Sequence, residues 1–137
     1  MFAKNHILIA DDDEDDFFLV KSALEDNGFE GKIDFVENGI ELLNFLKKNT
    51  GNLPDLVLLD LNMPKKDGRE VLVELRQVPA LAMIPVIVFT TSKAPEDIKT
   101  CYANGANCYI SKPSSFDDLV VLLDKILQFW LKTALLA

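Results

Sequence analysis

Polar side chains of the types that bind cations and phosphates follow four separate apolar runs of the chain. The run HILIA leads into six consecutive acids at positions 11–16. The run LVLL is followed by Asp60, VIVF by Thr90, and CYIS by Lys112. Carboxylates, a hydroxyl and an ammonium can together hold a divalent ion and neutralise phosphate oxygens. If the four runs are neighbouring strands, these groups form one polar site.

The carboxylates after the first and third runs indicate a binding site for a cation. Carboxylates close together repel one another unless they are protonated or bridged by a metal. Oxygen ligands suit Mg²⁺, and an aspartate beside Mg²⁺ can attack a phosphoryl group to give an aspartyl phosphate. Asp11 and Asp12 continue the strand toward this site, whereas the acids at 14–16 fit the first turn of a helix, where its dipole favours them. We therefore expect Asp15 and Asp16 on a solvated surface.

Strand and helix patterns alternate five times along the chain. Five apolar segments predict strands, at 6–10, 32–36, 56–60, 85–90 and 108–111. The third and fourth are apolar almost throughout, which is typical of parallel strands covered on both faces. Helix caps are predicted at Asn38, Asp67 and Ser115. The alternation indicates an α/β fold with a doubly wound parallel sheet, which binds ligands beyond the carboxyl ends of its strands.

Length and composition limit the class of protein. The 137 residues, 49% hydrophobic and 26% charged, predict one domain over 1–137 with a core at about 5–131. The net charge of −8 argues against nucleic-acid binding, and no apolar run reaches the ~20 residues of a membrane span. Cys101 and Cys108 are too few for a disulfide framework, and no signal peptide is evident. We expect a cytoplasmic protein that binds neither nucleic acid nor membrane.

Four motifs in this order resemble the receiver domain of response regulators in two-component signalling. ILIADDD resembles the acidic pair of the family's first strand, and LVLLDLNMPKKDG resembles its phosphoacceptor strand and loop. VIVFTTS resembles the hydroxyl strand, and GANCYISKP the fifth strand with its aromatic, lysine and proline. The resemblance implies a flavodoxin-like sheet of five parallel strands in the order 2-1-3-4-5, as in single-domain regulators of the chemotaxis type.

The resemblance also implies a phosphoryl and metal chemistry for particular residues. Asp60 would accept the phosphoryl group. Asp11 and Asp12 would hold Mg²⁺ or Mn²⁺ together with Asp60 and the backbone carbonyl of Asn62. The protein would then be a signalling receiver and not an enzyme, catalysing only its own phosphorylation and slow dephosphorylation.

Three further residues would respond to the phosphoryl group by the same resemblance. Thr90 and Lys112 would contact its oxygens, and the bond from Lys112 to Pro113 would be cis. Tyr109 stands at the position of the family's switch aromatic, although an aromatic residue on a strand can equally belong to the core.

The implied phosphoryl donor is a sensor histidine kinase. The phrases PKKDGREVL, NCYISK and ILQFWLKTALLA resemble the branch that is partnered with phytochrome-type kinases. With no output domain expected, the signal would pass to a downstream protein, or through a homodimer formed by the fourth helix, fifth strand and fifth helix. Phe129 lies off the apolar stripe of the last helix, where an exposed aromatic would mark such a face.

Two other classes share parts of this pattern. A haloacid-dehalogenase-like phosphotransferase also carries its nucleophile at a strand end, as Asp-x-Asp, but Asn62 replaces the second acid and cannot act as a general acid. A flavodoxin-like binding module would place a phosphate after the first strand, where the acids at 11–16 would repel it. The receiver interpretation is therefore favoured.

Overall fold

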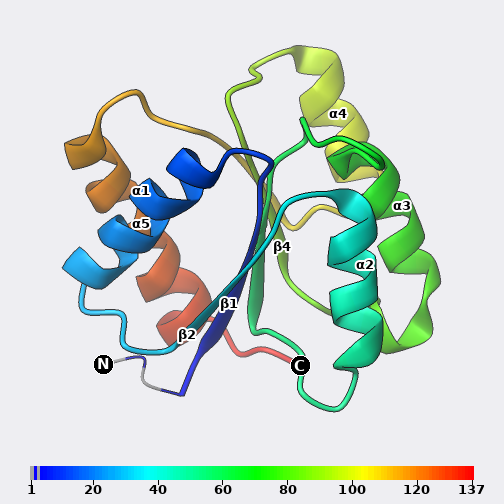
Figure 1. Cartoon of the computed structure of the whole chain (residues 1–137), viewed down its shortest axis with the longest axis horizontal. Coiled ribbons are helices and arrows are strands. Elements are labelled where there is room, and N and C mark those ends of the chain that lie inside the picture. The colour runs from blue at the N-terminus through cyan, green and yellow to red at the C-terminus, as the bar shows by residue number, and fades with distance from the viewer. Residues whose placement is uncertain (1, 3) are drawn as a thin grey trace.

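The computed structural model describes residue 2 and residues 4–137, which build a five-stranded parallel sheet between two layers of helices (Figure 1). The elements are β1 (His6–Ala10), α1 (Glu14–Asp26), β2 (Lys32–Val36), α2 (Gly39–Lys48), β3 (Leu56–Leu59), α3 (Gly68–Gln77), the 3₁₀ helix η1 (Pro79–Leu81), β4 (Val86–Thr90), α4 (Pro95–Ala103), β5 (Cys108–Ser111), α5 (Phe116–Gln128) and the π-helical turn η2 (Phe129–Thr133). The strand order is β2-β1-β3-β4-β5, which confirms the predicted fold class.

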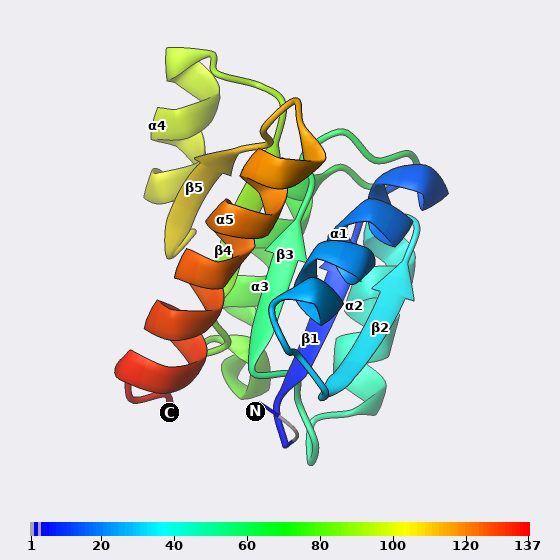
Figure 2. The same cartoon turned by 90° about the vertical axis from the view of Figure 1, so that its left-hand side faces the viewer.

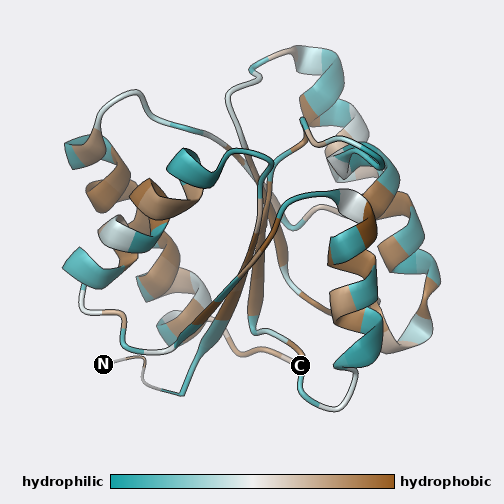
Figure 3. Cartoon of the chain, in the orientation of Figure 1, coloured by the Kyte–Doolittle hydropathy of each residue, from teal (hydrophilic) through white to brown (hydrophobic). Residues whose placement is uncertain are grey.

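The central strands are apolar throughout because both of their faces are covered. On β1, Leu8 and Ala10 pack with α2, α3 and α4, whereas Ile7 and Ile9 pack with α1 and α5. Residues of β3 and β4 alternate between the same two clusters. Figure 1 shows these two helical layers, and Figure 3 shows the apolar strands between them. Polar side chains that serve a site must therefore lie beyond the strand ends.

The helices begin where the sequence predicts caps. The side chains of Asn38, Asp67 and Ser115 each accept a hydrogen bond from a backbone N–H two or three residues further on. Asp13 does the same at the start of α1, so this acid of the 11–16 run is a helix cap. These bonds satisfy N–H groups that have no partner within a helix.

Some details of the backbone differ from the sequence-based expectations. The bond from Lys112 to Pro113 is trans, so the prediction of a cis bond was wrong; trans is the favoured isomer of such bonds by about 0.5–1 kcal/mol. Pro85 lies outside β4 because it has no N–H to donate, although its carbonyl accepts from Val57 N at 2.9 Å. No helix in the described part of the chain is long and apolar enough to cross a membrane.

Candidate functional site

The strand register brings the predicted site residues to one edge of the sheet. Ala10 pairs with Leu59, so Asp11 and Asp60 follow directly on neighbouring strands. Asp60 N donates to Ala10 O at 2.9 Å, which continues the pairing by one residue. In Figure 2 the arrowheads of β1, β2 and β3 point toward this edge.

Three carboxylates form an acidic cluster there. One carboxylate oxygen from each of Asp11, Asp12 and Asp60 lies within 4.8 Å of the corresponding oxygens of the other two. Asp11 is 3% exposed and Asp60 is 8% exposed, whereas Asp12 reaches solvent. Burial raises the pKa of Asp11, although a hydrogen bond from a neighbouring lysine opposes this effect. The backbone N–H of Asn62 donates to Asp60 Oδ1 at 3.3 Å, which places Asn62 beside the cluster.

Lys112 supplies the positive charge of the site. Its Nζ donates to Asp11 Oδ2 at 2.7 Å, to Asp16 Oδ2 at 3.1 Å and to Asp60 Oδ2 at 3.2 Å. Burial alone would lower the pKa of Lys112, but the hydrogen bond to Asp11 and the charges of Asp60 and Asp11 outweigh it, so the pKa is raised. The ammonium is therefore charged at any physiological pH.

Asp16 contradicts the prediction of a purely solvated side chain. It lies near the start of α1, and its carboxylate contacts Lys112 in the segment between β5 and α5. The neighbouring Asp15 does face solvent as expected. The sequence gives no signal for this contact, because Asp16 and Lys112 are separated by 96 positions.

Thr90 and Tyr109 lie on the adjacent strands β4 and β5. Thr90 is fully buried, and its hydroxyl has no hydrogen-bond partner in the described part of the chain. Lys112 N donates to Thr90 O at 2.8 Å, so the backbones of these two residues are joined. Tyr109 packs its ring against the core on the α2, α3 and α4 side, and its hydroxyl donates to Ser92 O at 2.9 Å.

A polar network that the sequence did not predict adjoins Tyr109. Arg69 Nε donates to Asp97 Oδ1 at 2.9 Å, and Ser92 Oγ donates to Asp97 Oδ2 at 2.7 Å. The hydrogen bonds from Ser92 and Arg69 lower the pKa of Asp97. The network connects the first turn of α3, the first turn of α4 and the loop after β4.

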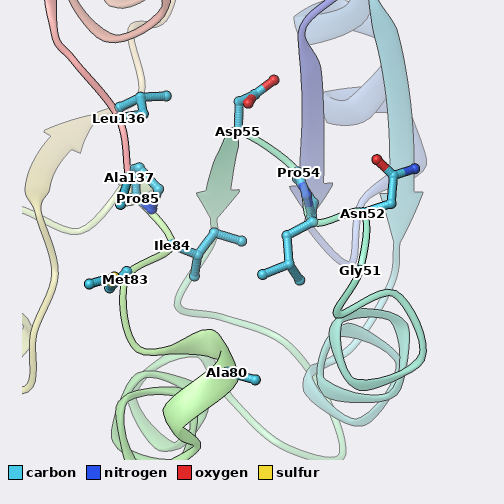
Figure 4. A pocket seen from close by; sticks show the side chains of 11 residues that line it. Gly51, Asn52, Pro54, Asp55, Ala80, Met83, Ile84, Pro85, Leu136 and Ala137 are labelled. Atoms are coloured by element: carbon cyan, nitrogen blue, oxygen red, sulfur yellow. The ribbon is translucent and has the colours of Figure 1, made fainter.

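A separate hollow of about 430 Å³ lies at the opposite edge of the sheet (Figure 4). Its lining includes Pro54 and Asp55 just before β3, Pro85 just before β4, and Leu136 in the C-terminal segment. Asp55 accepts a hydrogen bond from His6 N at 2.9 Å, and among the described residues no other acidic or basic side chain lines the hollow. The hollow is therefore not part of the polar site.

A parallel 2-1-3-4-5 sheet with acids, a threonine and a lysine at its carboxyl edge defines the class of response-regulator receivers. The sequence profile of the response regulator receiver domain matches residues 7–124, and the chain belongs to this family. Members are signalling proteins and not classical enzymes, so the phosphotransferase and flavodoxin-like alternatives are set aside.

Several similar proteins and solved structures align with most of this chain. The response regulator Rcp1 of Synechocystis sp. is 38% identical over 134 residues, which are 95% of this chain and 91% of Rcp1. The phosphorylated cyanobacterial phytochrome response regulator RcpA superposes with a TM-score of 0.90 at 39% identity, covering 98% of this chain and 99% of RcpA. The probable methanogenesis regulatory protein FilR2 of Methanothrix harundinacea is 39% identical over 128 residues, 91% of this chain and 83% of FilR2. The Mn²⁺-bound form of Rcp1 superposes with a TM-score of 0.86 at 37% identity, covering 97% of this chain and 99% of that one.

Proposed function

We propose that the protein is a phospho-accepting response regulator whose acceptor is Asp60. The observation that carries this proposal is the position of the Asp60 carboxylate, which lies 3.2 Å from the ammonium of Lys112 and belongs to the cluster with Asp11 and Asp12. An Asp60 oxygen would form a bond to phosphorus. The bond from phosphorus to the nitrogen of a phosphohistidine, or to the acetate oxygen of acetyl phosphate, would break, and its electron pair would stay with the leaving group.

The residues of the acidic cluster fit Mg²⁺ or Mn²⁺. Asp11, Asp12 and Asp60 provide oxygen ligands close together, and the Asn62 carbonyl is proposed as the fourth protein ligand. A bound ion would neutralise charge on the phosphoryl oxygens. The Mn²⁺-bound form of Rcp1 supports this assignment. Lys112, which is charged and mostly buried, would neutralise part of the negative charge of the phosphoryl group.

Thr90 is proposed to carry the signal away from Asp60. A buried hydroxyl without a partner is costly, and such groups are rare in folded proteins. A phosphoryl oxygen on Asp60 would give the Thr90 hydroxyl its missing acceptor. Movement of Thr90 would displace the loop after β4 that Tyr109 contacts through Ser92 O, which is why Tyr109 is proposed as the switch aromatic.

The partners proposed are a sensor histidine kinase and a downstream protein or a second copy of the chain. The phytochrome link in the name of RcpA supports a phytochrome-type kinase as donor. A shallow groove of about 590 Å³ between β5 and α5, with Ile110 and Phe129 in its lining, supports the proposed output face. Cys101 and Cys108 are unpaired, which supports the expected cytoplasmic location.

The test is the intact mass after incubation with acetyl phosphate, with and without Mg²⁺, for the wild type and Asp60→Asn. We expect the wild type to gain one phosphoryl group only when Mg²⁺ is present, and Asp60→Asn to gain none. A wild-type protein that is never modified, or a variant that is modified equally, would contradict the proposal.

A further inference from the structure

Asp16 contacts the lysine of the proposed phosphoryl site without belonging to the acidic cluster. An ammonium has three N–H donors, and those of Lys112 are engaged by Asp11, Asp16 and Asp60. Asp11 and Asp60 follow β1 and β3, whereas Asp16 approaches from α1. Its side chain is 39% exposed, compared with 11% for that of Lys112. Asp16 therefore binds Lys112 from the solvent side.

Apart from the helix dipole, which favours every acid in the first turn of α1, the described residues give Asp16 no role other than its contact with Lys112. The cap of α1 is Asp13, whose side chain accepts from the backbone N–H groups of Asp15 and Asp16. The carboxylate of Asp16 has no hydrogen bond or ion pair in the described part of the chain other than that with Lys112. The Asp16 carboxylate therefore acts on the position of the Lys112 ammonium and on the balance of charge around it.

We infer that Asp16 is a positioning residue that restrains Lys112 in the unphosphorylated protein and slows phosphorylation of Asp60. This inference rests on the proposed function of Asp60. The Lys112 bond to Asp60 is the one that a phosphoryl oxygen would take over, while Asp16 draws the ammonium toward α1. A phosphoryl group also adds about two negative charges to a pocket where Asp16 is a fourth carboxylate beside Asp11, Asp12 and Asp60.

The restraint of Lys112 and the charge repulsion both slow the phosphorylation of Asp60. Removing the charge of Asp16 weakens its hold on Lys112, which can then move more easily to the phosphoryl oxygens, and reduces the repulsion of the incoming group. The interaction of a half-exposed charge with a group a few ångströms away is strong enough to change the rate of phosphorylation by about three- to tenfold. Asp16→Asn is the sharpest variant, because its amide oxygen can still accept from Lys112 while the charge is lost.

Asp15→Asn is the matched control. It removes the same charge one position earlier in α1, and Asp15 is exposed and does not contact Lys112. Asp16→Glu tests rescue by a residue that keeps the charge, and Asp16→Ala removes the bond as well as the charge.

The experiment measures the rate constant of phosphorylation by acetyl phosphate at saturating Mg²⁺, by intact mass, for the wild type and these four variants. Each is also titrated for the Mg²⁺ concentration that gives half the maximal rate, and its thermal unfolding is recorded. We expect Asp16→Asn and Asp16→Ala to react about three- to tenfold faster than the wild type, with Asp15→Asn unchanged and Asp16→Glu returned toward the wild-type rate. If Asp16 had a merely structural role, its variants would shift the unfolding temperature, and their phosphorylation rates would not divide according to whether the charge is kept or lost.

The outcomes separate the inference from the proposed function. If the wild type is phosphorylated on Asp60 but Asp16→Asn and Asp16→Ala react no faster than Asp15→Asn, the inference is wrong and the proposed function stands. If the wild type is not phosphorylated at all, both are wrong.

Discussion

Arg76 joins three segments at the edge of the sheet opposite the polar site. Its Nε and Nη2 donate to Gly105 O at 3.0 and 2.8 Å, and its Nη1 donates to Ala82 O and Ile84 O at 3.0 and 2.8 Å. Nη2 also donates to Asn107 Oδ1 at 2.8 Å. The guanidinium has five N–H donors, so each one is used. The end of α3, the segment before β4 and the turn before β5 are therefore held by one side chain.

The substitution Arg76→Ala removes all of these bonds. The two bonds to Gly105 O and the one to Ile84 O are part-buried, whereas those to Ala82 O and Asn107 Oδ1 face solvent and can be replaced by water. At about 1 kcal/mol for each part-buried bond, the free energy of unfolding falls by about 3 kcal/mol. A lysine keeps the charge but carries its donors on one atom, so Arg76→Lys recovers only about 1 kcal/mol of this loss.

Urea unfolding monitored by circular dichroism measures these differences. Lys99→Ala is the control, because Lys99 is an exposed base on α4 and such surface changes usually stay within about 0.5 kcal/mol. A loss below about 1 kcal/mol for Arg76→Ala, or an Arg76→Lys variant as stable as the wild type, would refute the reasoning. Phosphorylation of Asp60 is expected to persist in Arg76→Lys, because Arg76 lies at the other end of the strands.

Three further variants test other parts of the structure. Thr90→Val replaces a buried hydroxyl that has no hydrogen-bond partner among the described residues. We therefore expect the stability in urea to be unchanged or higher by up to ~1 kcal/mol, with phosphorylation retained; a loss of more than ~1 kcal/mol would show that the hydroxyl is satisfied. Gly105→Ala should lower the thermal unfolding temperature more than Gly28→Ala does. Both glycines have positive φ, but only at Gly105 would an added Cβ meet a side chain, at 2.8 Å from Arg76 Cγ. Equal effects of the two substitutions would contradict this reasoning. Asp97 has a lowered pKa, so its contribution to stability is present above its unfolded pKa of about 3.9 and is lost as the pH falls through the folded value. Asp97→Asn should therefore lose stability relative to the wild type at pH 6 and approach it at pH 2–3, and a difference independent of pH would count against the pairing.

The features that the sequence predicted correctly depend on short stretches of chain. Strands such as β3 and β4 are recognised because burial on both faces requires an unbroken apolar run. The caps Asn38 and Ser115 are recognised because each bond joins residues three positions apart. The polar edge of the sheet then follows from the parallel arrangement of the strands, which brings their carboxyl ends together.

The features that the sequence did not predict depend on how the helices pack against one another, or on hydrogen bonds to backbone carbonyl groups. Asp16 meets Lys112 because the start of α1 lies beside the segment that follows β5 in the folded chain, and its residue type fits an exposed first turn equally well. Arg76 donates mainly to carbonyl groups, which every residue has, so no pattern of residue types marks its partners. Arg69 and Asp97 are likewise joined only by the packing of α3 against α4.

The polar network around Ser92 bears directly on how a charge at Asp60 would reach the output face. Ser92 lies two residues after Thr90, and it contacts Asp97 through its hydroxyl and Tyr109 through its carbonyl. Shifting a two-state equilibrium almost completely requires about 5.5 kcal/mol of differential stabilisation, whereas one hydrogen bond to a charged group supplies about 1.5–3 kcal/mol. A new bond to Thr90 is therefore too weak by itself. The proposed switch must also gain from Lys112 and from rearrangement of the Ser92 contacts, so Asp97 and Tyr109 are expected to change position together.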